Sequence, residues 1–394
     1  MKKNTLTNTS TQLTKLFRDF FNSEKAGGIV LVVCTLVSLL LVNSAWGGYY
    51  LHIWHYPLAG QPFEHWINDG LMAIFFLLIG LELEREIYIG ELANVKKALL
   101  PVSGALGGML LPAGIYLIFN LGTSTQPGAG IPMATDIAFA LGILALLGNK
   151  VPASLKVFLT ALAVIDDLGA ILVIAVFYTG TLAWAYLLAA LGIFILLLIL
   201  NRLKVRNLIP YLAGGVLMWY CMLHSGVHAT ITGVLVAFAI PFGKGDEKST
   251  SYLLQHFLHK PVAFFILPLF ALANTAIHIN PGWYKEFTQP YALGIIAGLL
   301  VGKPIGIILF SYLSVKLKIC TLPGDLKWKE VWGAGLLAGI GFTMSIFITL
   351  LAFNDSTTIN NAKLMIMAGS LVAGILGFAW LKTVLKDSHP VEEE

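Results

Sequence analysis

The distribution of long apolar segments constrains this chain more than any other feature of its sequence. A membrane-spanning helix needs about 20 mostly apolar residues, and twelve such segments follow one another along the 394 residues. Only 12% of the residues are charged, whereas a soluble domain carries about 25%. We therefore expect an all-α polytopic membrane protein with spans at about 27–43, 67–87, 98–119, 131–148, 154–178, 182–201, 208–223, 226–242, 261–278, 291–312, 330–352 and 363–381.

The basic residues predict how these spans are oriented. If the N-terminus is cytoplasmic and the sides alternate, 22 of the 25 Lys and Arg residues lie in cytoplasmic segments. Lys285 and Lys363 then fall outside, and Lys303 falls within a span. One span more or fewer would remove this asymmetry, which positive-inside topology requires. The predicted organisation is a cytoplasmic segment 1–26, one transmembrane domain at 27–381 and a cytoplasmic tail at 382–394.

Charge and cysteine content exclude several classes of function. The net charge of +4 is small and dispersed, so we expect no nucleic-acid partner. Cys34, Cys221 and Cys320 are odd in number and far apart, which argues against a disulfide framework or a structural metal site. The outer segment 44–66 is rich in aromatic residues and glycines. Its pattern fits either a short β-hairpin or an aromatic belt at the membrane interface.

Ionisable side chains inside the predicted spans are the strongest functional candidates, because each is costly in a bilayer. These residues are Asp136, Asp166, Asp167 and Lys303. Neighbouring residues on a helix point about 100° apart, so Asp166 and Asp167 can border one cavity and titrate as a coupled pair. Carboxylates of this kind can hold protons and can also give them up to a hard cation that prefers oxygen ligands.

Two spans are predicted to be poorly helical at their centres. In the span 131–148, Thr135 and Asp136 lie among small residues, and the span 330–352 contains a run rich in Gly and hydroxyl residues. Glycine can also serve close helix packing. However, the two spans occupy matching places in the trios 98–178 and 291–381. Paired interrupted spans indicate inverted repeats, and Asp136 and Lys303 could then offset the partial charges of the half-helix ends.

Titratable residues also cluster near the predicted membrane surfaces. Glu82, Arg85 and Glu86 lie at the cytoplasmic end of the second span, where they form either an acidic mouth or an ordinary solvated helix end. Histidine titrates near physiological pH. His256 and His259 precede the ninth predicted span, and His224 and His228 lie near the outer surface between the seventh and eighth.

Five sequence motifs together resemble the NhaA family of bacterial sodium/proton antiporters, from about residue 20 to about 380. They are residues 134–142, 165–170, 224–230, 302–304 and 339–345. The resemblance implies twelve helices, the fourth and eleventh of them unwound and crossing at mid-membrane, in the bacterial inner membrane with both termini cytoplasmic. It also implies a homodimer formed through a β-hairpin at 44–66.

The resemblance assigns roles to individual residues. Asp166 and Asp167 exchange protons and cations, Na⁺ binds Asp167 with help from Asp166 and Thr135, and Thr135 and Asp136 line or tune the site. Lys303 pairs with an aspartate, with Asp166 favoured, or compensates the crossing. The residues assigned to the pH response are Glu82, Arg85, Glu86, His228, His256 and His259. Gln255 and Glu84 depart from the family pattern, in which an acidic and a basic residue are expected, so the pH midpoint is not predicted.

The expected function is a pH-regulated, electrogenic exchange of Na⁺ or Li⁺ for about two protons by alternating access. The chain is thus predicted to be a secondary transporter without enzymatic activity and without a cofactor. A sodium-coupled solute symporter of a related fold is the alternative. An intramembrane aspartyl protease would need two facing aspartates inside the membrane, but the Gly-x-Gly-Asp sequence of this chain, at 243–246, lies between two predicted spans, and Lys303 would disturb a shared proton.

Overall fold

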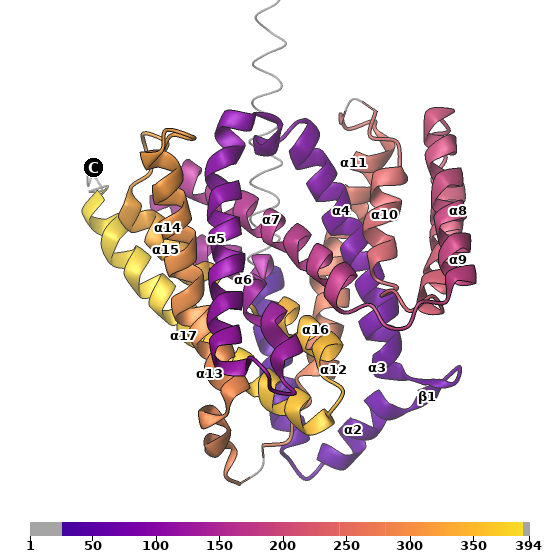
Figure 1. Cartoon of the computed structure of the whole chain (residues 1–394), viewed down its shortest axis with the longest axis horizontal. Helices are drawn as coiled ribbons and strands as arrows, with labels where there is room; N and C mark the ends of the chain where they lie inside the picture. The colour runs from indigo at the N-terminus through magenta and orange to yellow at the C-terminus, as the bar shows by residue number, and fades with distance from the viewer. Residues whose placement is uncertain (1–25, 244, 280, 389–394) are drawn as a thin grey trace, which may run out of the picture.

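The computed structural model describes residues 26–243, 245–279 and 281–388, and helices dominate this part of the chain (Figure 1). In it, eight helices are long and apolar enough to cross a membrane, or ten if two bent helix pairs are each one span. The bent pairs are Ala26–Val42 with Gly47–His55, at 115°, and Trp328–Ala338 with Phe342–Ala352, at 47°. Most of the predicted segments 1–26 and 382–394 lies outside the described residues or has no described side chains.

All twelve predicted segments overlap helices, but two of these helices are shorter than a span. They are α9 (Ile209–Leu223) and α10 (Ile231–Ala239). The segment predicted to start at residue 226 becomes helical only at Ile231, because Gly226 adopts a left-handed φ of 86° in a turn. Since α10 has only 9 residues, the count of twelve spans stays a prediction.

The helices pack into two bundles. The two predicted trios form the bundle that we call the trio bundle, in which α5 packs along α14 and α17 packs along α15. Its elements are α5 (Val95–Asn120), η3 (Gln126–Met133), α6 (Ile137–Leu146), α7 (Ala153–Phe177), α13 (Pro290–Ala297), η7 (Gly298–Gly302), α14 (Lys303–Lys316), α15 (Trp328–Ala338), α16 (Phe342–Ala352) and α17 (Ser356–Ser388).

The second bundle, which we call the flanking bundle, is built around the α4–α10 and α8–α9 pairs. The helix Ala26–Val42 joins it, since Ser38 donates a hydrogen bond to the Leu272 carbonyl. Its other elements are α3 (Phe63–His65), η1 (Trp66–Leu71), α4 (Met72–Tyr88), α8 (Trp184–Arg202), α9, α10, α11 (Thr250–Pro261), η5 (Val262–Ile266) and α12 (Leu267–Asn274). Direct packing between the bundles includes α4 against α7 and α12 against α16.

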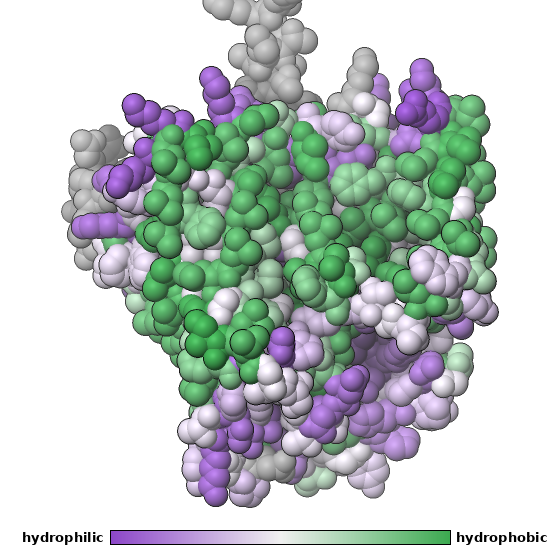
Figure 2. Space-filling model, in the orientation of Figure 1, coloured by the Kyte–Doolittle hydropathy of each residue, from purple (hydrophilic) through white to green (hydrophobic). Residues whose placement is uncertain are grey.

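The surface and the packing both suit a bilayer. Apolar side chains cover the middle of the face in Figure 2, and hydrophilic side chains gather at its top and bottom edges. Inside the trio bundle, α5 and α14 touch through glycines. A Cβ on Gly306 would lie 2.1 Å from the Gly107 carbonyl oxygen, and small residues at such contacts let membrane helices approach closely.

The outer segment 44–66 differs from the predicted β-hairpin. Its aromatic run forms the helix α2 (Gly47–His55), and the ladder is limited to β1 (Pro57–Leu58) against β2 (Gln61–Pro62). Tyr50 and Trp54 are four residues apart and both buried, a spacing that also fits one helix face. Pro57 ends the helix, because the residue before proline disfavours the α conformation. The short elements η2 (Glu91–Ala93), η4 (Gly148–Lys150) and η6 (Trp283–Thr288) complete the described fold.

Two predicted span boundaries are wrong in ways that affect function. The ninth span begins at Thr250 rather than at about 261, so His256 and His259 lie within a helix and not before it. The last span begins at Ser356, where Asp355 accepts a hydrogen bond from the Thr358 N–H. Lys363, which the prediction leaves outside, therefore lies inside a span and is buried.

Candidate functional site

The interruptions of the two predicted broken spans lie against each other. Residues 134–136 separate η3 from α6, and residues 339–341 separate α15 from α16. The Asp136 N–H donates to the Ile340 carbonyl over 2.6 Å, and Thr135 Oγ1 donates to the Ala338 carbonyl over 3.0 Å. Ser345 Oγ donates to the Ile131 carbonyl over 2.7 Å. Backbone groups that the interruptions release from helical bonding thus find partners in the other interrupted span.

Asp136 accepts hydrogen bonds at the start of two helices. Its Oδ1 accepts from the Phe139 N–H at the start of α6, over 3.0 Å. Its Oδ2 accepts from the N–H of Thr343 at the start of α16, over 3.1 Å, and from the Thr343 hydroxyl. Helix N-termini carry partial positive charge, so one buried carboxylate faces two positive ends.

Asp166 and Lys303 form a fully buried ion pair. Lys303 Nζ lies 2.9 Å from Asp166 Oδ2, and both side chains are 0% exposed. The same Asp166 oxygen accepts from Thr135 Oγ1 over 2.7 Å, while Lys303 also donates to the Met133 carbonyl at the end of η3. The pairing of Lys303 with Asp166 is therefore as favoured from the sequence, and the ammonium meets a helix end where negative charge accumulates.

Asp167 stands apart from this network. It is 1% exposed, and neither of its carboxylate oxygens has a hydrogen-bond partner in the described structure. Buried polar groups are almost always hydrogen-bonded, and a buried carboxylate without a partner is especially costly. Asp167 is therefore a carboxylate that a proton or a cation would stabilise.

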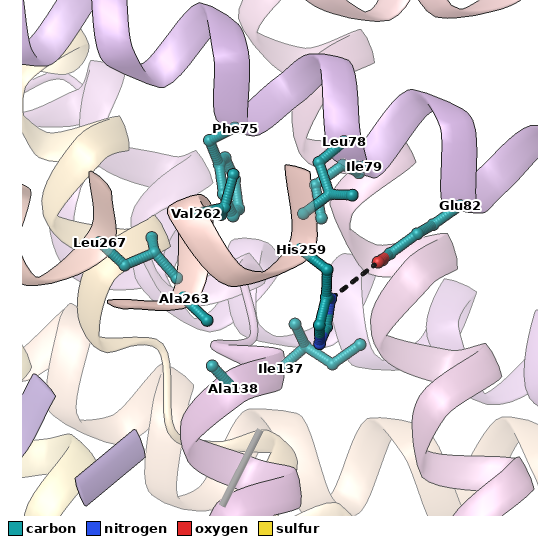
Figure 3. A pocket seen from close by; sticks show the side chains of 10 residues that line it. All are labelled: Phe75, Leu78, Ile79, Glu82, Ile137, Ala138, His259, Val262, Ala263 and Leu267. Atoms are coloured by element: carbon teal, nitrogen blue, oxygen red, sulfur yellow. Dashed lines mark ion pairs between the residues drawn. The ribbon is translucent and has the colours of Figure 1, made fainter. Parts of the chain in front are cut away.

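A small cavity lies between α4, the α11–η5–α12 segment and the start of α6 (Figure 3). Its volume is about 30 Å³, enough for one or two waters, since one water needs roughly 10–15 Å³. Glu82 and His259 are the titratable residues of its lining, and His259 Nδ1 lies 3.9 Å from Glu82 Oε1. Ile137 of the lining directly follows Asp136, so the cavity reaches the helix end that Asp136 caps.

Of the remaining residues predicted to respond to pH, Arg85 and Glu86 act electrostatically on Glu82, and His256 acts on His259, whereas His228 lies elsewhere. The Arg85 guanidinium lies 5.6 Å from the centre of the Tyr252 ring, against which His256 stacks at 6.2 Å. Glu86 accepts a hydrogen bond from the Glu91 N–H over 3.0 Å. His228 Nε2 lies 2.9 Å from the Tyr178 carbonyl oxygen at the C-terminal end of α7, on the predicted outer side.

The two departures from the family pattern lie near Glu82, between α4 and α11. Glu84 is buried, and its Oε2 accepts a hydrogen bond from Ser251 Oγ over 3.3 Å. Gln255 hydrogen-bonds to Glu82. The acidic charge that the family pattern places on α11 is thus absent, and α4 carries an additional carboxylate.

Sequence reasoning missed several residues that the structure connects to the site. Thr343 and Ser345 bind the opposite interruption, and their hydroxyls within a Gly-rich run were the available signal. Lys363, a buried lysine outside this site, was missed because α17 starts earlier than the predicted span. The helix-capping pattern Asp355-Ser356-Thr357-Thr358 could have corrected this.

Comparisons with known proteins place the chain in a family. The family model described as Na+/H+ antiporter 1 matches residues 18–381. The Na(+)/H(+) antiporter NhaA of Flavobacterium psychrophilum is 68% identical, covering 96% of this chain and 98% of that protein. The NhaA of Cytophaga hutchinsonii is 60% identical, covering 97% and 100%. The structure also resembles the sodium proton antiporter MjNhaP1 of Methanocaldococcus jannaschii, with a TM-score of 0.54, 15% identity, and coverage of 95% and 98%. The chain belongs to the NhaA family of Na⁺/H⁺ antiporters.

Proposed function

We propose that this protein exports Na⁺ or Li⁺ across the bacterial inner membrane in exchange for about two protons. One observation carries the proposal: Asp167 is buried and has no hydrogen-bond partner among the described residues, beside Asp166, which is held by Lys303 and Thr135. An unpartnered carboxylate in a dry site must hold a proton or a cation, because the bare charge is costly there. Protons and alkali cations would therefore compete for the same oxygens.

The neighbouring groups suit this competition. Na⁺ is a hard cation, and hard cations bind carboxylate, hydroxyl and carbonyl oxygens. The two oxygens of Asp167, with Asp166 and the Thr135 hydroxyl, would supply such ligands. When Na⁺ binds, Asp166 must either release Lys303 or divide its negative charge between Lys303 and Na⁺. We propose that this change releases a second proton, either from the pair of aspartates or from the lysine.

The interrupted helices would let the site open to each side in turn. We propose that they cross near mid-membrane as the centres of two inverted repeats, the trios 98–178 and 291–381. Asp136 at two positive helix ends and Lys303 at a negative one would balance their partial charges. Alternating access then requires the trio bundle to move against the flanking bundle, while Asp166 and Asp167 travel with α7.

The exchange of two protons for one Na⁺ moves one net charge inward per cycle. A membrane potential therefore contributes about 2.3 kcal/mol per 100 mV to sodium export. We propose that Glu82 and His259 in the cytoplasmic cavity, with Arg85, Glu86, His256 and His228, adjust the rate to pH. We also propose twelve spans with both termini cytoplasmic, and a homodimer formed through the segment 44–66.

Proton flux in everted membrane vesicles tests the exchange. Asp167→Asn should abolish Na⁺-driven and Li⁺-driven proton movement, because the amide can neither release a proton nor offer two anionic oxygens. The matched control is Asp246→Asn, which changes an exposed aspartate and should leave the flux unchanged. Full activity of Asp167→Asn would refute the proposal, and a flux that requires an organic solute would favour a sodium-coupled symporter.

A further inference from the structure

A second buried lysine lies outside the site described above. Lys363 of α17 is 7% exposed, and its Nζ lies 3.4 Å from Oδ1 of Asn274, which is 2% exposed at the end of α12. Asn274 Nδ2 donates to Asn68 Oδ1 of η1 over 2.7 Å. Among acidic groups, Glu64 of α3 acts on Lys363 electrostatically. An ionisable side chain inside a span is a functional candidate by default.

The position of Lys363 along α17 places it on the outer side of the exchange site. The Ser370 hydroxyl of α17 accepts a hydrogen bond from the Phe342 N–H, at the level of the helix interruptions. Lys363 precedes Ser370 by seven residues, which is roughly 10 Å at 1.5 Å per residue. In the predicted orientation, α17 starts on the outer side, so Lys363 lies about two turns outward from the interruptions.

The contacts of Lys363 join the two bundles. Lys363 belongs to the trio bundle, whereas Asn274 and Asn68 belong to the flanking bundle. An aromatic contact joins the same bundles nearby: the ring centre of Phe347 of α16 lies 5.5 Å from that of Phe76 and 6.5 Å from that of Phe270. All three rings are almost completely buried. A polar bond and an apolar plug therefore both lie at this part of the interface.

We propose that Lys363, Asn274 and Asn68, together with the Phe76–Phe347–Phe270 contact, form an outer gate that holds the exchange site closed to the outside. The inference rests on the proposed alternating-access exchange. The aromatic contact excludes water, and the Lys363–Asn274 bond must break if the bundles separate on the outer side. Among the described residues, the ammonium of Lys363 bonds to Asn274 and interacts electrostatically with Glu64. When the bond to Asn274 breaks, water would take its place, so opening of the gate and hydration of the lysine would occur together.

The reaction of a buried thiol with an impermeant reagent measures this opening. In a background with Cys34, Cys221 and Cys320 replaced by alanine and shown to exchange Na⁺ for H⁺, Thr349→Cys serves as the reporter. Thr349 is 0% exposed and lies two residues beyond Phe347 in α16. In right-side-out vesicles, adding Lys363→Met should raise the rate at which a charged maleimide labels the thiol at position 349 about fivefold or more. The effect should be this large because a hydrogen bond to a charged group is stronger than one between neutral groups, so its loss makes opening more frequent.

Three further variants separate the gate from a loss of folding. Lys363→Arg keeps a cation and should restore slow labelling. Asn274→Leu removes the acceptor from the opposite bundle and should raise the rate as Lys363→Met does. Lys285→Met changes an exposed lysine on the same predicted side and should leave the rate unchanged.

The labelling rates also separate failure of the gate from failure of the exchange mechanism. Unchanged labelling in both Lys363→Met and Asn274→Leu would overturn the gate, even if the vesicles exchange Na⁺ for H⁺ normally. Fast labelling in Lys363→Arg would also overturn the gate, because it would show that the polar bond made by a cation at this position does not keep the gate closed. Exchange that survives Asp167→Asn would instead refute the proposed function, whatever the labelling rates show.

Discussion

Asp136 accepts hydrogen bonds at the starts of both α6 and α16, and the cost of losing them can be predicted. Asp136 is 2% exposed, and its replacement by alanine leaves two backbone donors, the Phe139 N–H and the Thr343 N–H, without their acceptor. The Thr343 hydroxyl also loses its acceptor, but it is not counted because a hydroxyl can rotate toward another partner. Each buried donor left unsatisfied costs about 1–3 kcal/mol. We therefore expect Asp136→Ala to lower the free energy of unfolding by roughly 2–6 kcal/mol, that is, two donors at this cost. Asp136→Asn keeps one acceptor oxygen and should cost about half as much.

Equilibrium unfolding in mixed detergent micelles measures this loss. The matched control is Asn94→Ala, because Asn94 caps the start of α5 through a bond to the Lys96 N–H over 3.1 Å but is exposed. Loss of such a cap costs about 1 kcal/mol. If Asp136→Ala is no more destabilising than Asn94→Ala, the carboxylate does not support both helix starts and the reasoning is wrong.

Three further predictions concern packing, the buried ion pair and pH. Gly306→Ala should destabilise the α5–α14 contact, whereas Gly192→Ala, which meets open space, should be neutral or slightly stabilising in the same unfolding assay. Lys303→Met should lower the free energy of unfolding by about 3–5 kcal/mol, because it leaves Asp166 charged and unpaired. The double mutant Lys303→Met with Asp166→Asn should recover much of this loss. If the losses of the two single mutants simply add in the double mutant, the pairing is contradicted. Hydrogen bonds from the first turn of α17 lower the pKa of Asp355, so its contribution to stability is present above its unfolded pKa and is lost as pH falls through its folded pKa. Thermal unfolding of Asp355→Ala should therefore differ from that of the wild type at pH 7 and converge with it in strong acid, and a constant difference would contradict this cause.

Local sequence signals predicted most of the helices but failed at particular boundaries. The aromatic run at 46–56 alternates as a strand would, yet Tyr50 and Trp54 also lie one helical turn apart, and tertiary burial selects the helix. The ninth span was placed at about 261 because the polar residues near His256 lower its hydropathy. Packing of α11 against α4 provides an environment for those residues, so the helix continues through them.

The residues of the proposed exchange site could be found from the sequence because charged residues are rare in lipid. Asp166, Asp167 and Lys303 stand out for this reason, since a charged residue survives in a span only if function or pairing retains it. Lys363 is buried as well, but the predicted boundary of the last span puts it at the outer edge, where charge is common. Roles such as pH sensing are different, because titratable residues near the predicted membrane surfaces are common and carry no comparable cost.

The sequence by itself determined that the chain is a helical membrane protein, and it predicted an orientation from the basic residues and the charged residues of the proposed exchange site. These properties follow from the composition of local segments and from the cost of charge in lipid. Only the tertiary structure decided between the possible partners of Lys303 and showed that Asp136 bonds to Thr343 and that Asp167 has no hydrogen-bond partner among the described residues. The reason is that the partners are far apart in the chain, by 207 positions for Asp136 and Thr343. No local pattern specifies which distant groups the packing of helices brings together.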